Sequence, residues 1–175
     1  MIISVEQARE LVSFPESWTD AKIEMKLRAI EQTVRAYTHN DFVDRDYRRT
    51  AAIVGGSFVV DALTPFATGD TVQITETRLN KGLFTVAVAD ESVFSVVEAV
   101  QDESAVLVTK VIYPADVVDC CVNLLEWEIT NRDKVGVKSE TLSRHSVTYE
   151  DSASMFLGYP LALLGCLKLY RKLRC

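Results

Sequence analysis

Residues 139–151, SETLSRHSVTYED, bring together the side-chain types that a serine hydrolase uses, and His145 is one of 2 histidines in the chain. A catalytic serine must lie within hydrogen-bond reach of its histidine base, which a third group orients. In an extended segment the Cα atoms of Ser143 and His145 would be about 7 Å apart, so their contact is possible but not preset. The chain also has no G-x-S-x-G turn to expose a nucleophile. We therefore expect a polar strand or loop here, and no enzyme.

Three other motifs fail a similar comparison. In a calcium loop started at Asn131, Gly136 takes the sixth position, but Leu142 takes the twelfth, where a bidentate Glu is needed. Gly55 and Gly56 lack the Lys-Ser/Thr that follows a phosphate-binding loop, so we interpret them as a linker at the edge of the β region. The cysteines, at positions 120, 121, 166 and 175, form no CxxC pair, and we expect buried or idle thiols. No metal or other cofactor is expected.

The charge balance limits the choice of partners. A formal charge of -6 argues against a protein that binds nucleic acid with its whole surface, because phosphate binding needs clustered Lys and Arg. The basic end, KLYRKLRC, leaves two readings open: a phosphate contact or a solvated helix end. No membrane segment is expected, because the apolar runs are far shorter than the roughly 20 residues that span a bilayer.

Two helices are predicted in the first forty residues. Ser4 and Gln7 form a capping-box pattern before a helix over 5–13, which Pro15 stops. Thr19 or Asp20 then caps a longer helix. Its apolar stripe is Ile23, Leu27, Ile30, Val34 and Tyr37.

The hydrophobic period changes after Thr50. Segments such as SFVVDA, TVQITET, LFTVAVA and AVLVTKVI are rich in β-branched and aromatic residues, and they predict about five short strands. Gly82 can take the positive φ of a tight hairpin with a bulge. Strands this close together cannot be joined by helices, so we expect an antiparallel sheet or a small barrel.

A third helix is predicted from Pro114 to Asn131, and from Val135 the chain becomes polar and alternating before a basic, helical end. The expected fold class is α+β: a small helical bundle with an inserted antiparallel β-sheet or small barrel and an extended C-terminal tail. The expected domains are a helical core (1–50 and 114–134), an inserted β domain (51–113) and a tail for oligomerisation and docking (135–175).

The order of elements and three stretches resemble a known family. These are GDTVQITETRLNKGLFTV, then YPADVVDCCVNLLEWEITNRDKVGVKSETLSRHSVTY, and GYPLALLGCLKLYRKLR. Together they look like the head-tail connector (adaptor, head completion) proteins of long-tailed phages, and the resemblance covers nearly the whole chain. Its most specific portion is the third helix with RDKVGVKSETLSRHSVTY and the GYP that follows.

The resemblance implies structural work in the virion neck, after assembly in the host cytoplasm. Such proteins form a ring, usually of twelve copies, below the portal; the ring extends the DNA channel and presents a surface for the tail. The implied partners are the portal protein, a tail-side neck protein (stopper or tail terminator), further copies of the chain, and genomic DNA that passes without sequence-specific binding. No membrane is involved.

The polar alternating segment could add a strand to a partner sheet. The apolar C-terminal end has few places to be buried in a three-helix monomer, so we expect this end to lie between subunits. The expected contact residues are Glu140, Leu142, Arg144, His145, Val147, Tyr149, Tyr159, Leu167, Tyr170 and Arg171. Acidic side chains such as Asp90, Glu91, Glu98, Asp102 and Glu103 could line a channel that repels DNA, or lie on a solvated outer face. The alternative function is a small β-domain module that binds a ligand or nucleic acid, with the helices as a scaffold.

Overall fold

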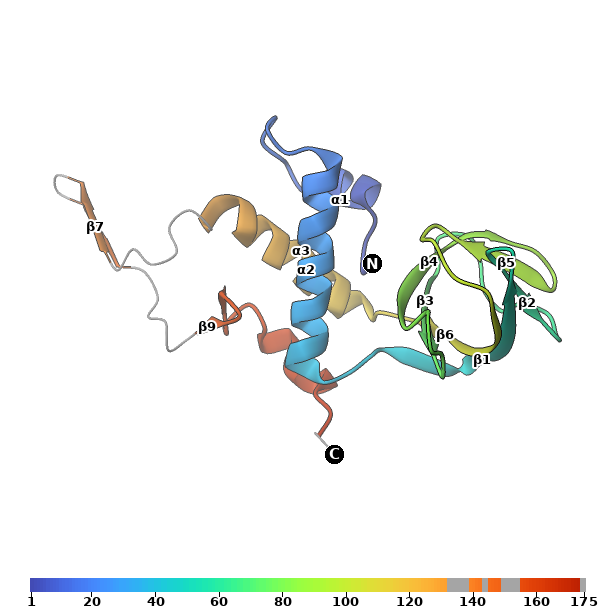
Figure 1. The fold of residues 1–175 in the computed structure, drawn as a ribbon. Coiled ribbons are helices and arrows are strands. Elements are labelled where there is room, and N and C mark those ends of the chain that lie inside the picture. Colours follow the sequence, from blue (N-terminus) through green and yellow to red (C-terminus); the bar gives the residue numbers. More distant parts are fainter. Residues whose placement is uncertain (132–138, 143–144, 149–154, 174–175) are drawn as a thin grey trace. The chain divides into compact units, whose positions relative to one another are not determined.

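The structure is a computed structural model that describes residues 1–131, 139–142, 145–148 and 155–173. The protein combines helices with a closed antiparallel β-barrel (Figure 1). It forms two compact units. The barrel unit comprises Met1 and Asp41–Tyr113, and the helical unit comprises Ile2–Asn40 and Pro114–Cys175. The barrel is thus inserted between two parts of the helical unit.

The two N-terminal helices begin at the predicted caps. Helix α1 covers Val5–Leu11, with the full capping box of Ser4 and Gln7, and it ends two residues earlier than predicted. Helix α2 covers Asp20–Thr38, and the Thr19 hydroxyl caps it by accepting from the Lys22 amide. Its predicted stripe is buried, including Ile23, Leu27, Ile30, Val34 and Tyr37.

Helix α3 covers Ala115–Asn131 and packs against α2. Two of its backbone amides, those of Val117 and Val118, donate to the Pro114 carbonyl, so the proline lies one residue before the helix and not in its first turn as predicted. Its buried face consists of Val117, Cys120, Cys121, Leu124, Leu125 and Glu128. A glutamate on this face needs partners, because burial of an unpaired carboxylate is costly.

Six strands close the barrel in the order β1-β2-β5-β4-β3-β6, and every pairing is antiparallel. They are β1 (Val43–Val54), β2 (Ser57–Val60), β3 (Thr71–Thr75), β4 (Gly82–Ala89), β5 (Val93–Val96) and β6 (Glu103–Val111). Of the two expected forms, an antiparallel sheet or a small barrel, the structure has the barrel, with six strands instead of about five. Closure removes the unpaired strand edges that an open sheet would expose.

The first strand begins earlier than the sequence period indicated, at Val43 instead of after Thr50. The register shifts between Asp44 and Arg48 where β1 pairs with β6, so side chains do not alternate regularly between the two faces there. The first half of the strand, VDRDYRR, accordingly shows no alternation of apolar and polar residues. A strand with such an irregularity lacks the period-two signal.

Two glycine predictions are wrong. Gly55 and Gly56 are not a linker but the two-residue turn between β1 and β2, with φ of 58° and 80°. Positive φ at both central residues is the requirement of a type I′ hairpin turn. Gly82 does not take positive φ; it lies at the start of β4, opposite Ile74.

Aromatic and aliphatic side chains fill the barrel interior. Phe58 stacks on Phe94 with ring centroids 4.6 Å apart, and Phe66 meets Phe94 edge-on at 5.0 Å. The buried cluster is Ala51, Ile53, Phe58, Val60, Phe66, Val72, Ile74, Val86, Phe94, Val106 and Val108. The barrel therefore has a packed core rather than an interior ligand site.

The C-terminal part contains two small hairpins and a 3-10 helix. Strands β7 (Ser139–Leu142) and β8 (His145–Thr148) pair with each other, as do β9 (Met155–Phe156) and β10 (Tyr159–Pro160). The predicted α-helical end is instead the 3-10 helix η3, Gly165–Tyr170. Since a 3-10 helix repeats every three residues, it places Leu164 and Leu167 on one side, and both are buried. Among the described residues, no helix has the length and apolar character needed to span a bilayer.

Candidate functional site

The polar stretch SETLSRHSVTYED forms a hairpin over its described residues. Glu140 lies opposite Val147 and Leu142 lies opposite His145. Arg144 and Tyr149 lie outside the described residues, as do residues 132–138, Ser143 and Asp151 of the calcium-loop and triad motifs. Over the described ranges β7 and β8 pair only with each other, so each strand keeps one edge at which backbone groups can meet a further strand.

Tyr159 anchors the second hairpin in the helical unit. Its side chain is buried, its ring lies 5.5 Å from that of Trp127, and its hydroxyl donates a 2.7 Å hydrogen bond to Glu128 Oε1. The Lys26 ammonium donates to Glu128 Oε2 at 2.9 Å. The Glu128 carboxylate thus joins α2, α3 and β10, and these charge-assisted hydrogen bonds offset the cost of its burial.

Four further contacts hold the end of the described chain on the same unit. Lys172 N donates to Thr38 O at 2.8 Å, and the Arg171 guanidinium lies 5.1 Å from the centre of the Tyr37 ring. The Tyr170 hydroxyl donates to the Asp116 carboxylate at 2.7 Å, and this hydrogen bond raises the pKa of Tyr170. The Asn40 amide donates to the Tyr170 carbonyl at 3.3 Å. Residues 155–173 therefore dock on α2 and α3 of their own chain.

This docking changes the expectation for the apolar C-terminus. Tyr159 and Leu167 are 3% and 0% exposed within the monomer, so their apolar surface is already covered without a neighbouring subunit. The prediction assumed that three helices offered few places to bury this segment, whereas η3 packs against both α2 and α3. Leu169 and Leu173, by contrast, are 87% and 92% exposed.

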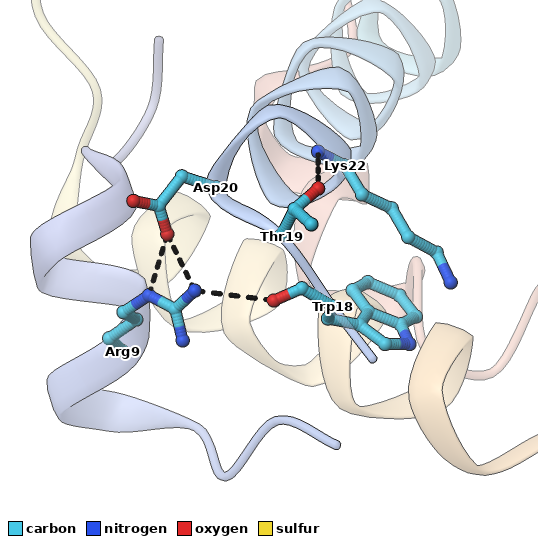
Figure 2. Close-up of polar contacts among 5 residues, drawn as sticks. All are labelled: Arg9, Trp18, Thr19, Asp20 and Lys22. Carbon is cyan, nitrogen blue, oxygen red and sulfur yellow. Dashed lines mark hydrogen bonds and ion pairs between the residues drawn. The ribbon is translucent and has the colours of Figure 1, made fainter. Parts of the chain in front are cut away.

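Polar contacts also fix the corner between α1 and α2 (Figure 2). The Arg9 guanidinium donates to Asp20 Oδ1 and to the Trp18 carbonyl. Figure 2 shows the Lys22 side chain beside the Trp18 indole, and its ammonium lies 4.3 Å from the ring centre. These are cation–carboxylate and cation–π contacts on an exposed corner, and no nucleophile takes part in them. Their role is to orient α1 on α2.

A hollow of about 480 Å³ lies between the end of α1 and the second half of α3. Its lining includes Leu11, Ser13, Glu126, Trp127 and Leu163. The lining combines leucine and tryptophan side chains with a serine hydroxyl and a glutamate carboxylate.

The buried thiols are unsuited to nucleophilic chemistry. Burial raises the pKa of Cys121 to about 12, with a smaller contribution from the charge of Glu31. Burial likewise raises the pKa of Cys120, whose thiol donates to the Leu163 carbonyl. Because the thiolate is the reactive form, both side chains act as small core residues. Within the described ranges, no cluster of three or more His, Cys, Asp or Glu side chains could hold a metal.

In the barrel unit, Glu103 ties the loop between β3 and β4 to the start of β6. The Thr77 hydroxyl, the Arg78 amide and the Asn80 side chain all donate to its carboxylate. These hydrogen bonds, that of Thr77 first, hold the pKa of Glu103 below its usual value. Asn80 also exchanges two hydrogen bonds with the Gln101 backbone. This network stabilises a loop. It gives Glu103 a structural role, whereas the sequence had left two roles open for it, in a channel lining or on an outer face.

Sequence reasoning missed the Glu128 network. Glu128 does fall on the apolar face of the predicted third helix, and a carboxylate in that position indicates a buried ionic partner. The partners themselves, Lys26 and Tyr159, are 102 and 31 residues away in the chain, so no local pattern connects them.

Comparison with known proteins gives no family assignment. No family model matches the chain, and no curated protein matches it.

Proposed function

We propose that this protein is a structural component of the neck of long-tailed phage virions, a head-tail connector without enzymatic activity. In this role, copies of the chain form a ring of twelve between the portal and the tail-side neck protein, the stopper or tail terminator. The ring extends the DNA channel and completes the head for tail attachment. In this view the helical unit serves as the bundle of the ring, and the β7–β8 hairpin, within the tail 135–175, docks on the portal.

The observation that carries the proposal is the hairpin β7–β8 in the C-terminal part of the chain. It lies in the sequence between α3 and residues 155–173, both of which pack in the helical unit. The outer edges of β7 and β8 suit β-strand addition to a partner protein. In that mode backbone hydrogen bonds supply affinity and alternate side chains supply specificity. The sequence resemblance to connectors is most specific over the same residues.

The barrel gives less support to the alternative of a ligand- or nucleic-acid-binding module. Its interior is filled by eleven buried side chains. Over residues 41–113 eleven acidic side chains stand against six basic ones, a balance that repels phosphates. Lys110 pairs with Asp70, and the Arg48 guanidinium donates to the Thr109 hydroxyl, so two of these cations already have partners within the barrel.

Co-assembly with the portal of the same phage tests the proposal. The full chain should bind portal rings and be present in purified virions by mass spectrometry, with density in the neck by cryo-electron microscopy. Replacement of residues 139–148 by a Gly/Ser linker of equal length should abolish portal binding, while tryptophan fluorescence and circular dichroism stay native. The barrel control Leu79→Asn/Ile112→Asn, at two exposed apolar positions, should leave portal binding unchanged. Absence of the chain from purified virions would refute the proposal.

A further inference from the structure

One outer wall of the barrel carries no charge. In the pairing of β1, β2, β5 and β4, one row of outward side chains is Ala52, Val59 and Val93, and the next row is Val54, Ser57, Ser95 and Val88. We call these seven residues the valine face. Its four valines are 38–63% exposed. The residues next to the face residues in the same strands, such as Ile53 and Phe58, are buried in the barrel core.

Acidic side chains border the valine face at both ends. Asp61, Asp90 and Glu91 lie at one end, where the Val60 amide bonds the Ser92 carbonyl and the Thr64 amide bonds the Glu91 carbonyl. At the other end Asp102 accepts a hydrogen bond from the Gly56 amide. An exposed apolar patch with a polar rim is typical of a protein-binding surface. The acidic rim favours a basic partner and disfavours a second acidic face.

The same chain offers a surface of the opposite kind at its C-terminus. Residues 155–175 contain four basic side chains and no acidic one. Leu169 and Leu173 are almost fully exposed there, beside the exposed cations Lys168, Arg171 and Lys172. We call residues 168–173 the basic segment. Leu167, just before this segment, is buried, and the Lys172 amide donates to the Thr38 carbonyl of α2. Leu169 and Leu173 nevertheless remain in solvent.

We propose that the valine face of one copy binds the basic segment of a second copy. Apolar side chains meet in the centre, and the cations meet the acidic rim. Such a contact uses two different patches, so it is heterologous and propagates head to tail until a ring closes. The proposal rests on the ring of the proposed function and names the contact between its subunits.

The contact is weak when it acts singly. With a rise of about 3.4 Å per residue and strands about 4.8 Å apart, seven outward positions cover roughly 200 Å². Stable interfaces bury about 800 Å² per partner, so a contact of this size is too small to be stable on its own. A closed ring strengthens it, because each copy is then held on both sides.

Sedimentation equilibrium of the full chain up to about 1 mM tests the inference with two variants of unchanged net charge. The face variant is Val59→Asn/Val93→Asn and the segment variant is Leu169→Asn/Leu173→Asn. Wild type should exceed the mass of a dimer as concentration rises, and each variant alone should remain at 19.6 kDa. An equimolar mixture should stop at the heterodimer, because only one intact face meets one intact segment. The control Leu79→Asn/Ile112→Asn, at two exposed apolar positions off the face, should associate like wild type.

Three other results would overturn the inference. A segment variant that still dimerises alone would indicate a face-to-face contact, and a wild type that stays monomeric would mean that the two patches do not bind each other between copies. Association that rises with salt would contradict the charge complementarity. If wild type stays monomeric yet enters virion necks, the contact is refuted and the proposed function stands. If the heterodimer forms but the chain is absent from virions, the contact stands and the proposed function is refuted.

Discussion

Replacing Tyr159 by Phe isolates one hydrogen bond to the buried Glu128 carboxylate. The change removes the hydroxyl and keeps the ring beside Trp127. A hydrogen bond to a charged group contributes about 1.5–3 kcal/mol, and the Glu128 side chain is only 1% exposed, so screening by solvent does not reduce it. We expect the free energy of unfolding of the helical unit to fall by about 1.5–3 kcal/mol.

Urea denaturation followed by tryptophan fluorescence measures this loss. Both tryptophans, Trp18 and Trp127, belong to the helical unit, so the signal is specific to it. With a slope of about 2 kcal/mol per molar urea, the unfolding midpoint should fall by about 1 M. The control Tyr47→Phe removes an exposed hydroxyl from the barrel and should change the midpoint by less than about 0.25 M.

A double-mutant cycle decides whether the effect depends on the charge. Glu128→Gln keeps an oxygen acceptor for the Tyr159 hydroxyl but removes the charge. The cost of Tyr159→Phe should therefore be smaller in the Gln background, by at least about 0.5 kcal/mol. An equal cost in both backgrounds would show that the effect does not depend on the charge, and a loss below about 0.5 kcal/mol in the wild type would show that the hydroxyl does not stabilise the carboxylate.

Three more predictions concern the barrel and the thiols. Gly56→Ala should destabilise the barrel by about 1 kcal/mol in thermal melts, because Ala resists the φ of 80° although nothing crowds its Cβ. The folded-state pKa of Glu103 lies below 4.5, so its stabilisation is present above pH 4.5 and is lost as the pH falls through the folded-state value. Glu103→Gln should therefore flatten the decline in melting temperature below pH 4.5. In a Cys175→Ser background at pH 8, an aromatic disulfide reagent should modify Cys166 rapidly and Cys121 only on unfolding, because Cys166 is exposed and burial raises the pKa of Cys121 to about 12. Rapid modification of more than one thiol would contradict the last prediction.

The sequence was most informative where structure depends on near neighbours. The caps at Ser4 and Thr19 use residues three positions apart, so the sequence alone predicts them. The barrel was also predictable as a class, since strands at short spacing leave no room for crossover helices. The start of its first strand was not predictable, because the register shift after Asp44 breaks the alternation of apolar and polar residues that indicates a strand.

The C-terminal segment shows where local pattern fails. LALLGCLKLYRKLR has the composition of a helix end, yet its conformation depends on packing against α2 and α3, which buries Leu164 and Leu167 at a spacing of three. The anchoring of Tyr159 likewise depends on Glu128, a tertiary partner. Where burial is decided by distant elements, composition and periodicity are insufficient.

The insertion of the barrel has a consequence for folding. Its two ends meet: Val43 pairs with Val111, and the Ile112 amide donates to the Phe42 carbonyl. Before the barrel forms, α3 must find α2 across a loop of about 70 residues, whose closure costs about 4 kcal/mol. Once the barrel has formed, the same two chain ends are already adjacent and most of that entropy is gone. The folded barrel therefore holds the two parts of the helical unit close together in the chain, and a mutation that unfolds the barrel should also destabilise the helical unit.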